Sequence, residues 1–206
     1  MNAALASAHP SPLSAAPAPI LIHCERCTDV PAREALLDRC FGTDRATRTC
    51  QRLRDGRLPA AGLAFSALKN GRLVGTLRLW HVNAGGRRAL MLGPLAVDPA
   101  CRDDGIGSAL MEHALTRARR LGHCAVILLG DAPYYARFGF STTATGTLAL
   151  PGPFAPERLL GLELTPGALD GAQGMVIATG SRALPPRSAF SAPRAAKTAR
   201  PVRKAA

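Results

Sequence analysis

The sequence lacks the segments that would place the chain in or across a membrane. It contains no run of about 18 consecutive apolar residues, the length that a membrane-spanning helix needs. Its first 19 residues contain no Lys, Arg, Asp or Glu. They therefore have neither the charged start of a secretory signal nor the arginines of an organellar transit peptide. We expect a cytoplasmic protein whose cysteines are reduced thiols.

Aromatic residues are scarce, at 4% of the chain, and this bears on its strong positive charge. A net charge of +12 by itself favours a nucleic-acid partner. Seven of the net positive charges lie in 181–206, which contains no acid, and this leaves only +5 for 20–180. A basic tail without aromatic residues attracts phosphates but cannot stack on bases. We expect no nucleic-acid partner except through this tail.

Composition divides the chain into three parts. Residues 1–19 are mostly Ala, Ser and Pro, and 181–206 are Pro, Ala, Ser and basic residues. Such segments cannot bury a core, so we expect both to be disordered tails. The chain as a whole is 47% hydrophobic, which is enough for one core, and we place a single domain at 20–180.

The sequence also lacks a complete set of metal ligands. Cys24 and Cys27 form a close pair next to His23, but no second pair occurs among the six cysteines. A structural zinc site needs four ligands, and a thioredoxin-type pair would stand at the start of a helix. We interpret the pair as structural or incidental, and expect no metal.

Apolar periodicity predicts alternating strands and helices between 20 and 180. Asn70-Gly71 is a hairpin signal, and Asp29 with Pro31 is a helix start. The sequence predicts strands at 20–22, 63–68, 73–81, 89–97, 125–129, 145–150 and 175–179, helices at 33–41, 47–58, 104–121 and 133–138, and a helical turn near 157–160. The compact strand–helix–strand unit at 89–129 implies parallel neighbours joined by a right-handed crossover.

The most informative stretch is 92–121, a buried strand, a glycine-rich turn and an amphipathic helix. Such a turn presents unpaired backbone N–H groups, which suit a phosphate. A dinucleotide fingerprint needs a third glycine where Leu110 stands, and a P-loop needs Gly-Lys-Ser/Thr, which is absent. What remains is Arg-x-x-Gly-x-Gly, formed by Arg102, Gly105 and Gly107.

Three segments together resemble the GNAT superfamily of acetyl-CoA-dependent N-acetyltransferases. LAVDPACRDDGIGSALM, at 95–111, resembles the acetyl-CoA motif of that superfamily. VILLGDAPYYARFGF, at 126–140, resembles the strand and helix that follow it, and GRLVGTLRLW, at 71–80, resembles the preceding meander. The segments GDAPYYARFGF, at 130–140, and LPGPF, at 150–154, resemble the YhbS-like branch of the superfamily. The resemblance extends over 20–180 and neither tail.

This resemblance implies both a fold and an activity. The fold is α/β, with a mixed, mostly antiparallel sheet that splays at two central parallel strands and carries helices on both faces. The activity is transfer of an acetyl group from acetyl-CoA to a primary amine, of a small molecule or protein, by direct attack in a ternary complex. The alternative is a non-catalytic acyl-CoA-binding or RNA-associated module of the same fold. We expect a monomer or homodimer, and an acceptor site built by the first two helices and 140–175.

The resemblance also implies which residues bind acetyl-CoA. The pantetheine arm would pair with the strand backbone, and the pyrophosphate would lie on the turn. The implied residues are Leu95, Ala96, Val97, Arg102, Asp103, Asp104, Gly105, Ile106, Gly107 and Ser108. Asp103 and Asp104 depart from the family pattern, because two acids beside a pyrophosphate repel it unless they point to solvent.

Acetyl transfer from a thioester needs a proton donor for the leaving thiolate and a stabilised oxyanion. The resemblance places the donor at Tyr135, four residues before Gly139, with its neighbour Tyr134 as the alternative. Asp131 and His81 are candidate general bases, but an ordinary structural role explains Asp131 at least as well and explains His81 better, so we assign neither as the base. We expect a backbone N–H near Val97 to bind the oxyanion.

Overall fold

The computed structural model describes residues 19–183. Its strands are β1 (Ile20–Cys24), β2 (Ala64–Lys69), β3 (Arg72–Ala84), β4 (Arg87–Val97), β5 (Ala125–Leu129), β6 (Leu148–Ala149), β7 (Leu159–Glu163) and β8 (Gly174–Ala178). Its α-helices are α1 (Val30–Phe41), α2 (Ile106–Arg120) and α3 (Ala132–Ala136), and its 3-10 helices are η1 (Cys27–Asp29), η2 (Thr43–Thr47), η3 (Thr49–Leu53), η4 (Pro99–Asp104) and η5 (Pro156–Arg158). None of the described helices is long and apolar enough to cross a membrane.

The predicted tails lie almost wholly outside the described residues. The described chain continues past the predicted domain end at 180 for three residues. Backbone hydrogen bonds of 2.9 Å join Leu58 N to Ser181 O and Ala183 N to Gly56 O. These bonds tie the last described residues to the loop that precedes β2.

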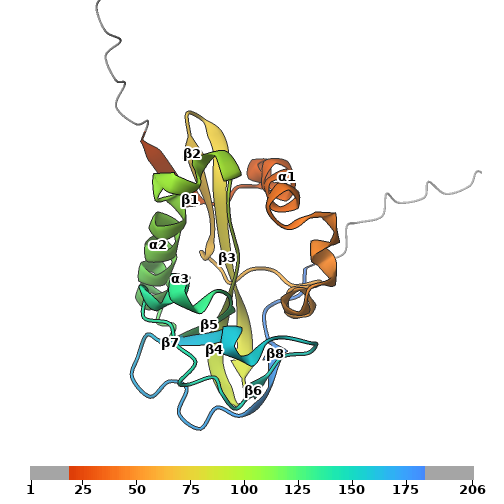
Figure 1. The fold of residues 1–206 in the computed structure, drawn as a ribbon, viewed down its shortest axis with the longest axis vertical. Coiled ribbons are helices and arrows are strands. Elements are labelled where there is room, and N and C mark those ends of the chain that lie inside the picture. The colour runs from red at the N-terminus through yellow and green to blue at the C-terminus, as the bar shows by residue number, and fades with distance from the viewer. Residues whose placement is uncertain (1–18, 184–206) are drawn as a thin grey trace, which may run out of the picture.

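One mixed sheet organises the molecule (Figure 1). Its strands follow the order β1-β2-β3-β4-β5-β7, and β8 pairs with the far end of β3 and with β6. Every neighbouring pair on the main path is antiparallel except β4 and β5, which are parallel. The predicted mixed, mostly antiparallel sheet with a central parallel pair is therefore confirmed.

The parallel pair separates soon after it forms, as predicted. Only two residue pairs join the strands, Leu90 with Val126 and Met91 with Ile127. Beyond them β4 carries one extra residue relative to β3, since Leu92 lies opposite Leu79 and Leu95 opposite Leu77. This β-bulge contains Gly93 and Pro94, and such an insertion bends a strand and increases its twist. The last residues of β4 therefore remain paired with β3 but not with β5.

Helices cover both faces of the sheet, as predicted (Figure 1). α2 packs on one face through its buried stripe of Ile106, Leu110, Met111, Ala114, Leu115 and Ala118. Gly75 of β3 permits this close packing, because a Cβ there would lie 2.8 Å from Ile106 Cγ2. α1 packs on the other face, where Leu36 and Leu37 contact Leu73.

The apolar stripe of α2 ends earlier than predicted. Leu121, the last residue of the amphipathic helix predicted at 104–121, is 41% exposed. The helix ends at Arg120, and Gly122 has a φ of +77°, which turns the chain away from the sheet. Leu121 therefore lies outside the helical repeat that faces the core.

The structure contradicts one predicted helix and contains one strand that was not predicted. The helix predicted at 47–58 is instead the two 3-10 helices η2 and η3, the second of which ends at Leu53. One glycine and three threonines in 42–49 disfavour a longer α-helix. The helical turn predicted near 157–160 is present as η5, but it ends at Arg158, and the strand β7 that follows it was not predicted. β7 is a short apolar run whose conformation is set by pairing with β5 rather than by its own periodicity.

Candidate active site

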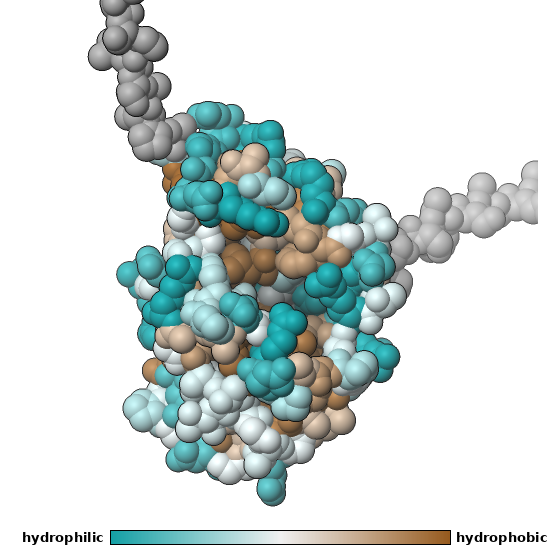
Figure 2. Space-filling view, viewed as in Figure 1, coloured by the Kyte–Doolittle hydropathy of each residue, from teal (hydrophilic) through white to brown (hydrophobic). Residues whose placement is uncertain are grey.

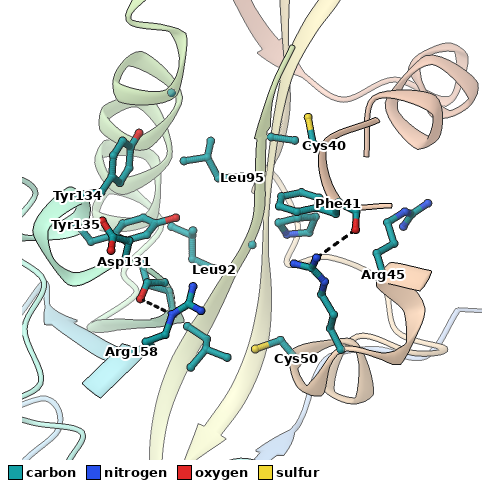
Figure 3. Close-up of a pocket in the computed structure, with 18 of the residues that line it drawn as sticks. Cys40, Phe41, Arg45, Cys50, Leu92, Leu95, Asp131, Tyr134, Tyr135 and Arg158 are labelled. Atoms are coloured by element: carbon teal, nitrogen blue, oxygen red, sulfur yellow. Dashed lines mark hydrogen bonds between the residues drawn. The ribbon is translucent and has the colours of Figure 1, made fainter. Parts of the chain in front are cut away.

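A cleft of about 1120 Å³ opens where β4 and β5 separate. Figure 2 shows this face hollowed, with apolar residues gathered in the hollow and hydrophilic residues around it. β4 runs through the cleft and divides its lining into two parts (Figure 3). The turn half contains Arg102, Asp103, Gly105, Gly107, Ser108, Gly130, Asp131, Tyr134, Tyr135, Arg137 and Arg158. The arginine half contains Cys40, Phe41, Arg45, Thr47, Arg48, Thr49, Cys50, Gln51, Arg54 and 153–155.

The turn at the start of α2 is held by a buried carboxylate. The Asp98 side chain accepts a hydrogen bond from Ala100 N at 3.1 Å, and Pro99 follows as the first residue of η4. Gly105 then adopts a left-handed conformation, with φ of +72°, and α2 begins at Ile106. The first N–H groups of α2 have no partner within the helix, so they are available at the mouth of the cleft.

The predicted turn residues separate into two groups. Arg102, Asp103, Gly105, Gly107 and Ser108 line the cleft. Ile106 and Asp104 do not belong to the lining of the cleft. The Ile106 side chain is fully buried under the sheet. The Asp104 carboxylate forms an ion pair with Lys69, from the β2–β3 hairpin, at 2.7 Å.

This ion pair accounts for one of the two acids that depart from the family pattern. The hydrogen bond from Lys69 lowers the pKa of Asp104, and the same bond raises the pKa of Lys69. The carboxylate is therefore neutralised by the hairpin instead of facing the turn. Asp103 remains in the lining, beside Arg102.

The end of β4 offers backbone groups to the cleft. Asp98 N donates to Val74 O of β3 at 2.8 Å. Because antiparallel pairing alternates, Ala96 also directs its backbone groups toward β3, whereas Leu95 and Val97 direct theirs toward the cleft. The thiol of Cys40, from α1, donates to Val97 O at 3.3 Å. The N–H of Val97 and both groups of Leu95 therefore form the open edge.

The two tyrosines of α3 point to different parts of the turn half. The Tyr135 ring lies on Gly130, where an added Cβ would be 2.2 Å from Cε2, and its hydroxyl points toward β4 between Leu92 and Leu95 (Figure 3). The Tyr134 hydroxyl lies over Gly107, where an added Cβ would be 2.8 Å away. Tyr135 thus faces the middle of the cleft and Tyr134 faces the turn.

Burial changes the acidity of Tyr135. Desolvation, with a smaller contribution from neighbouring Tyr134 and Asp131, raises the pKa of Tyr135 to about 12. Removing a phenol from water disfavours its anion, so the hydroxyl stays protonated at neutral pH. A protonated hydroxyl that points into the cleft is a proton donor.

The residues considered as general bases are not brought together. Asp131 lines the turn half and is exposed at the start of α3. His81 does not line the cleft; its ring lies 5.3 Å from that of His123.

Among residues 19–183, no group of three or more His, Cys, Asp or Glu side chains is placed to hold a metal ion. The Cys24 and Cys27 side chains are exposed.

Sequence reasoning missed Asp98, although it links three elements at the site. Its side chain is 6% exposed and forms ion pairs with Arg72 of β3 and with Arg39 of α1. The hydrogen bond from Ala100 N, followed by the one from Arg72, lowers the pKa of Asp98. The signal that could have identified it is an Asp-Pro pair directly after an apolar strand, which is typical of a capped turn.

Sequence reasoning also missed the residues of the arginine half. The guanidinium Nη2 of Arg48 donates to Phe41 O at 3.1 Å, and Arg54 Nε donates to Cys50 O at 3.2 Å. The Thr49 hydroxyl donates to Pro153 O and so closes this half against the 150–156 connection. The available signal was the density of arginines in 45–54.

Comparison with known proteins identifies related chains. Residues 30–140 match the model of the acetyltransferase (GNAT) family. The chain is 31% identical over 159 residues to the uncharacterised N-acetyltransferase YhbS of Escherichia coli strain K12, which covers 76% of this chain and 95% of the relative. It is 30% identical over 125 residues to the uncharacterised N-acetyltransferase YjhQ of the same strain, covering 58% of this chain and 68% of the relative.

Two solved structures have the same architecture. The structure of YhbS from Escherichia coli in complex with CoA has a TM-score of 0.68 at 31% identity, covering 83% of this chain and 93% of that one. The structure of a GNAT family acetyltransferase from Brucella melitensis in complex with acetyl-CoA has a TM-score of 0.57 at 27% identity, covering 78% and 96%. The family model, the YhbS alignment and the splayed sheet agree, and the chain is an N-acetyltransferase that belongs to the acetyltransferase (GNAT) family.

Proposed function

We propose that the protein binds acetyl-CoA in the turn half of the cleft and transfers its acetyl group to a primary amine that enters from the arginine half. Direct attack in a ternary complex fits this division, because both halves open onto the same stretch of β4. The observation that carries the proposal is the position of Tyr135. Its protonated hydroxyl points toward β4 between the two halves (Figure 3).

The turn half has the groups that a CoA thioester needs. The N–H groups at the start of α2 and the guanidinium of Arg102 suit a pyrophosphate. Gly105 and Gly107 leave the backbone open to close approach. The open edge of β4, at Leu95 and Val97, suits the amide groups of a pantetheine arm.

The reaction balances with the groups of the cleft. The neutral amine nitrogen attacks the thioester carbonyl carbon, a C–N bond forms, and the carbonyl oxygen becomes an oxyanion to which Val97 N–H donates a hydrogen bond. The C–S bond then breaks, and the departing thiolate takes the proton of the Tyr135 hydroxyl. The amine nitrogen loses one proton to solvent at the mouth of the cleft, where exposed Asp131 can relay it. A proton from solvent restores Tyr135.

Release of free thiol tests the proposal. Purified protein is mixed with acetyl-CoA and a panel of primary amines, and CoA release is followed with a thiol reagent. We expect thiol release that depends on the amine and that yields one N-acetyl product per thiol. If CoA raises the melting temperature while no amine releases thiol, the protein is an acyl-CoA-binding module and the proposed transfer is wrong.

A further inference from the structure

The arginine half of the cleft has an excess of positive charge. Its lining contains Arg45, Arg48 and Arg54, and no Asp or Glu of the described chain lines this half. An amine acceptor would enter as a cation before it loses its proton, so a surface of this sign repels a simple polyamine. The positive charge of this half therefore indicates that the acceptor carries a further group besides its amine.

The three arginines are not equivalent. Arg45 is neutralised by ion pairs with Glu34 and Asp38, both on α1. Arg48 and Arg54 form no ion pair with any carboxylate among residues 19–183. Two guanidinium groups in this half thus keep their full charge.

Neutral groups hold these two guanidinium groups in place. Arg48 is fixed by its bond to Phe41 O, and its guanidinium lies 5.2 Å from the centroid of the Phe41 ring. Arg54 is fixed by its bond to Cys50 O, and its guanidinium lies 5.4 Å from the centroid of the Trp80 ring. Carbonyls and aromatic faces orient a guanidinium without cancelling its charge. Each arginine is therefore oriented and still has N–H donors to offer.

Buried arginines elsewhere in the protein are paired with carboxylates. Arg33 is almost fully buried and pairs with Glu25 and Glu34, and half-buried Arg78 also pairs with Glu25. A partly desolvated cation without a counter-charge is costly, and a planar guanidinium favours a bidentate oxyanion partner. In the cleft, no carboxylate among residues 19–183 forms an ion pair with Arg54.

We infer that the acceptor carries an oxyanion, a carboxylate or a phosphate, on the same small molecule as its primary amine, and that Arg54 and Arg48 bind this oxyanion. This inference rests on the proposed function, since it concerns the acceptor of that reaction. The oxyanion supplies the missing counter-charge and orients the amine relative to β4. Arg54 and Arg48 are thus specificity-determining residues of the arginine half.

Matched pairs of amines test the inference by turnover. The pairs are amino acids against their carboxamides, and O-phosphoethanolamine against ethanolamine, with spermidine as a polycationic amine. We expect kcat/KM for the anionic member of a preferred pair to exceed that of its neutral partner about tenfold or more, the range of a charge-assisted hydrogen bond. The two kinds of pair distinguish a carboxylate from a phosphate. Equal rates within every pair, or a preference for spermidine, would overturn the inference and leave the proposed function standing.

Variants assign the preference to particular residues. Arg54→Gln and Arg48→Gln should each raise KM for the anionic amine about tenfold and so reduce its advantage over the neutral partner, with KM for acetyl-CoA changed less than about twofold. Arg54→Lys keeps the charge but not the fork, so it should restore part of the preference. Arg52→Gln is the matched control, because Arg52 lies in η3, between Arg48 and Arg54, and also donates to a carbonyl, Pro151 O at 2.6 Å, but does not line the cleft. An equal loss with both members, or the same loss in Arg52→Gln, contradicts the assignment.

A binding measurement keeps the inference separate from the proposed function. CoA-loaded protein is titrated by calorimetry with N-acetyl amino acids and with their N-acetyl carboxamides. Tighter binding of the acids, lost in Arg54→Gln and in the more exposed Arg48→Gln, supports the oxyanion site even if no amine releases thiol. Equal binding of acids and amides overturns it. The melting temperature of each variant, with and without CoA, identifies a variant that fails to fold.

Discussion

Backbone groups line one half of the cleft, and side chains line the other. The turn half is mainly backbone: the start of α2, two glycines and the open edge of β4. The arginine half consists of side chains at the end of α1, on and directly beside two short 3-10 helices, and on the 153–155 segment. A backbone site recognises a group common to many reactions, whereas side chains can change from one relative to another without altering the sheet. The difference explains why the first half resembles a whole family and the second does not.

The largest effect is expected from closing the turn half. In Gly107→Val the new side chain would occupy the space of the Tyr134 hydroxyl, 2.8 Å from the Cβ position, and block the approach to α2. We expect the Kd for CoA to rise about a hundredfold or more, a cost of about 3 kcal/mol. Calorimetric titration with CoA measures it.

Gly146→Ala is the matched control for this variant. Nothing lies within 4 Å of a Cβ at Gly146, which does not line the cleft. If Gly107→Val binds CoA within about threefold of the parent while folding normally, the turn does not carry the pyrophosphate.

The next largest effect is expected at the boundary of the two halves. Tyr135→Phe removes the proposed proton donor, and we expect kcat to fall about 10²- to 10³-fold with KM for acetyl-CoA unchanged. Tyr134→Phe, which alters the hydroxyl over Gly107, should change CoA affinity more than kcat. Steady-state thiol release separates the two parameters, and an unchanged kcat in Tyr135→Phe would refute the assignment.

The pH profile sharpens the same assignment. Because the pKa of Tyr135 is raised to about 12, its hydroxyl remains protonated across the ordinary range. Deprotonation of this donor would lower the rate only as the pH rises toward that value. A kcat that instead declines with an apparent pKa near 10, and loses this decline in Tyr135→Phe, would show that the buried phenol is more acidic than the structure indicates.

A smaller effect is expected at Asp98, which connects the turn of one half to α1 of the other. Asp98→Asn weakens the ion pairs that join α1, β3 and the turn, and we expect the free energy of unfolding to fall by about 1–3 kcal/mol. The folded-state pKa lies below the ordinary value of 3.8, so this stabilisation is complete above that pH and is lost as the pH falls through the lowered pKa.

Urea unfolding between pH 2.5 and 7 measures this contribution. The difference between Asp98→Asn and the parent should shrink toward the acid end of this range. Asp55→Asn serves as the control, since Asp55 is exposed, accepts one side-chain hydrogen bond, from Gln51, and does not itself line the cleft. A difference that is constant across pH would mean that the charge of Asp98 is not what stabilises the turn.

The smallest effect concerns the departure from the family pattern in the turn half. Lys69→Met leaves the charge of Asp104 unneutralised beside the turn. We expect the Kd for CoA to rise about two- to fivefold at low salt, since exposed ion pairs contribute little. Asp104→Asn in the same background should restore the affinity, and about 0.5 M NaCl should abolish the difference. A change that persists in high salt would point to a structural cause.

The sheet and the turn half could be predicted from the sequence because their signals are local. Apolar runs located most strands, and glycines spaced around Arg102 located the turn. β7 was missed because five residues of a Pro/Gly-rich connection become a strand only by pairing with β5. The arginine half was missed because its residues meet across about a hundred positions, as Thr49 and Pro153 do. The roles of Arg48 and Arg54 depend on which carboxylates are near, and spacing does not encode this.

The bulge in β4 also determines what the open edge can accept. An unpaired strand edge inside a molecule is a template on which any extended polypeptide could add as a new strand. Pro94, at the start of the open edge, has no N–H to donate, so an added strand would lose a rung there. A short ligand whose amide groups lie opposite Leu95 and Val97 alone loses no hydrogen bond, because it does not reach Pro94. The same proline that interrupts the sheet therefore makes its edge selective for a small molecule over another chain.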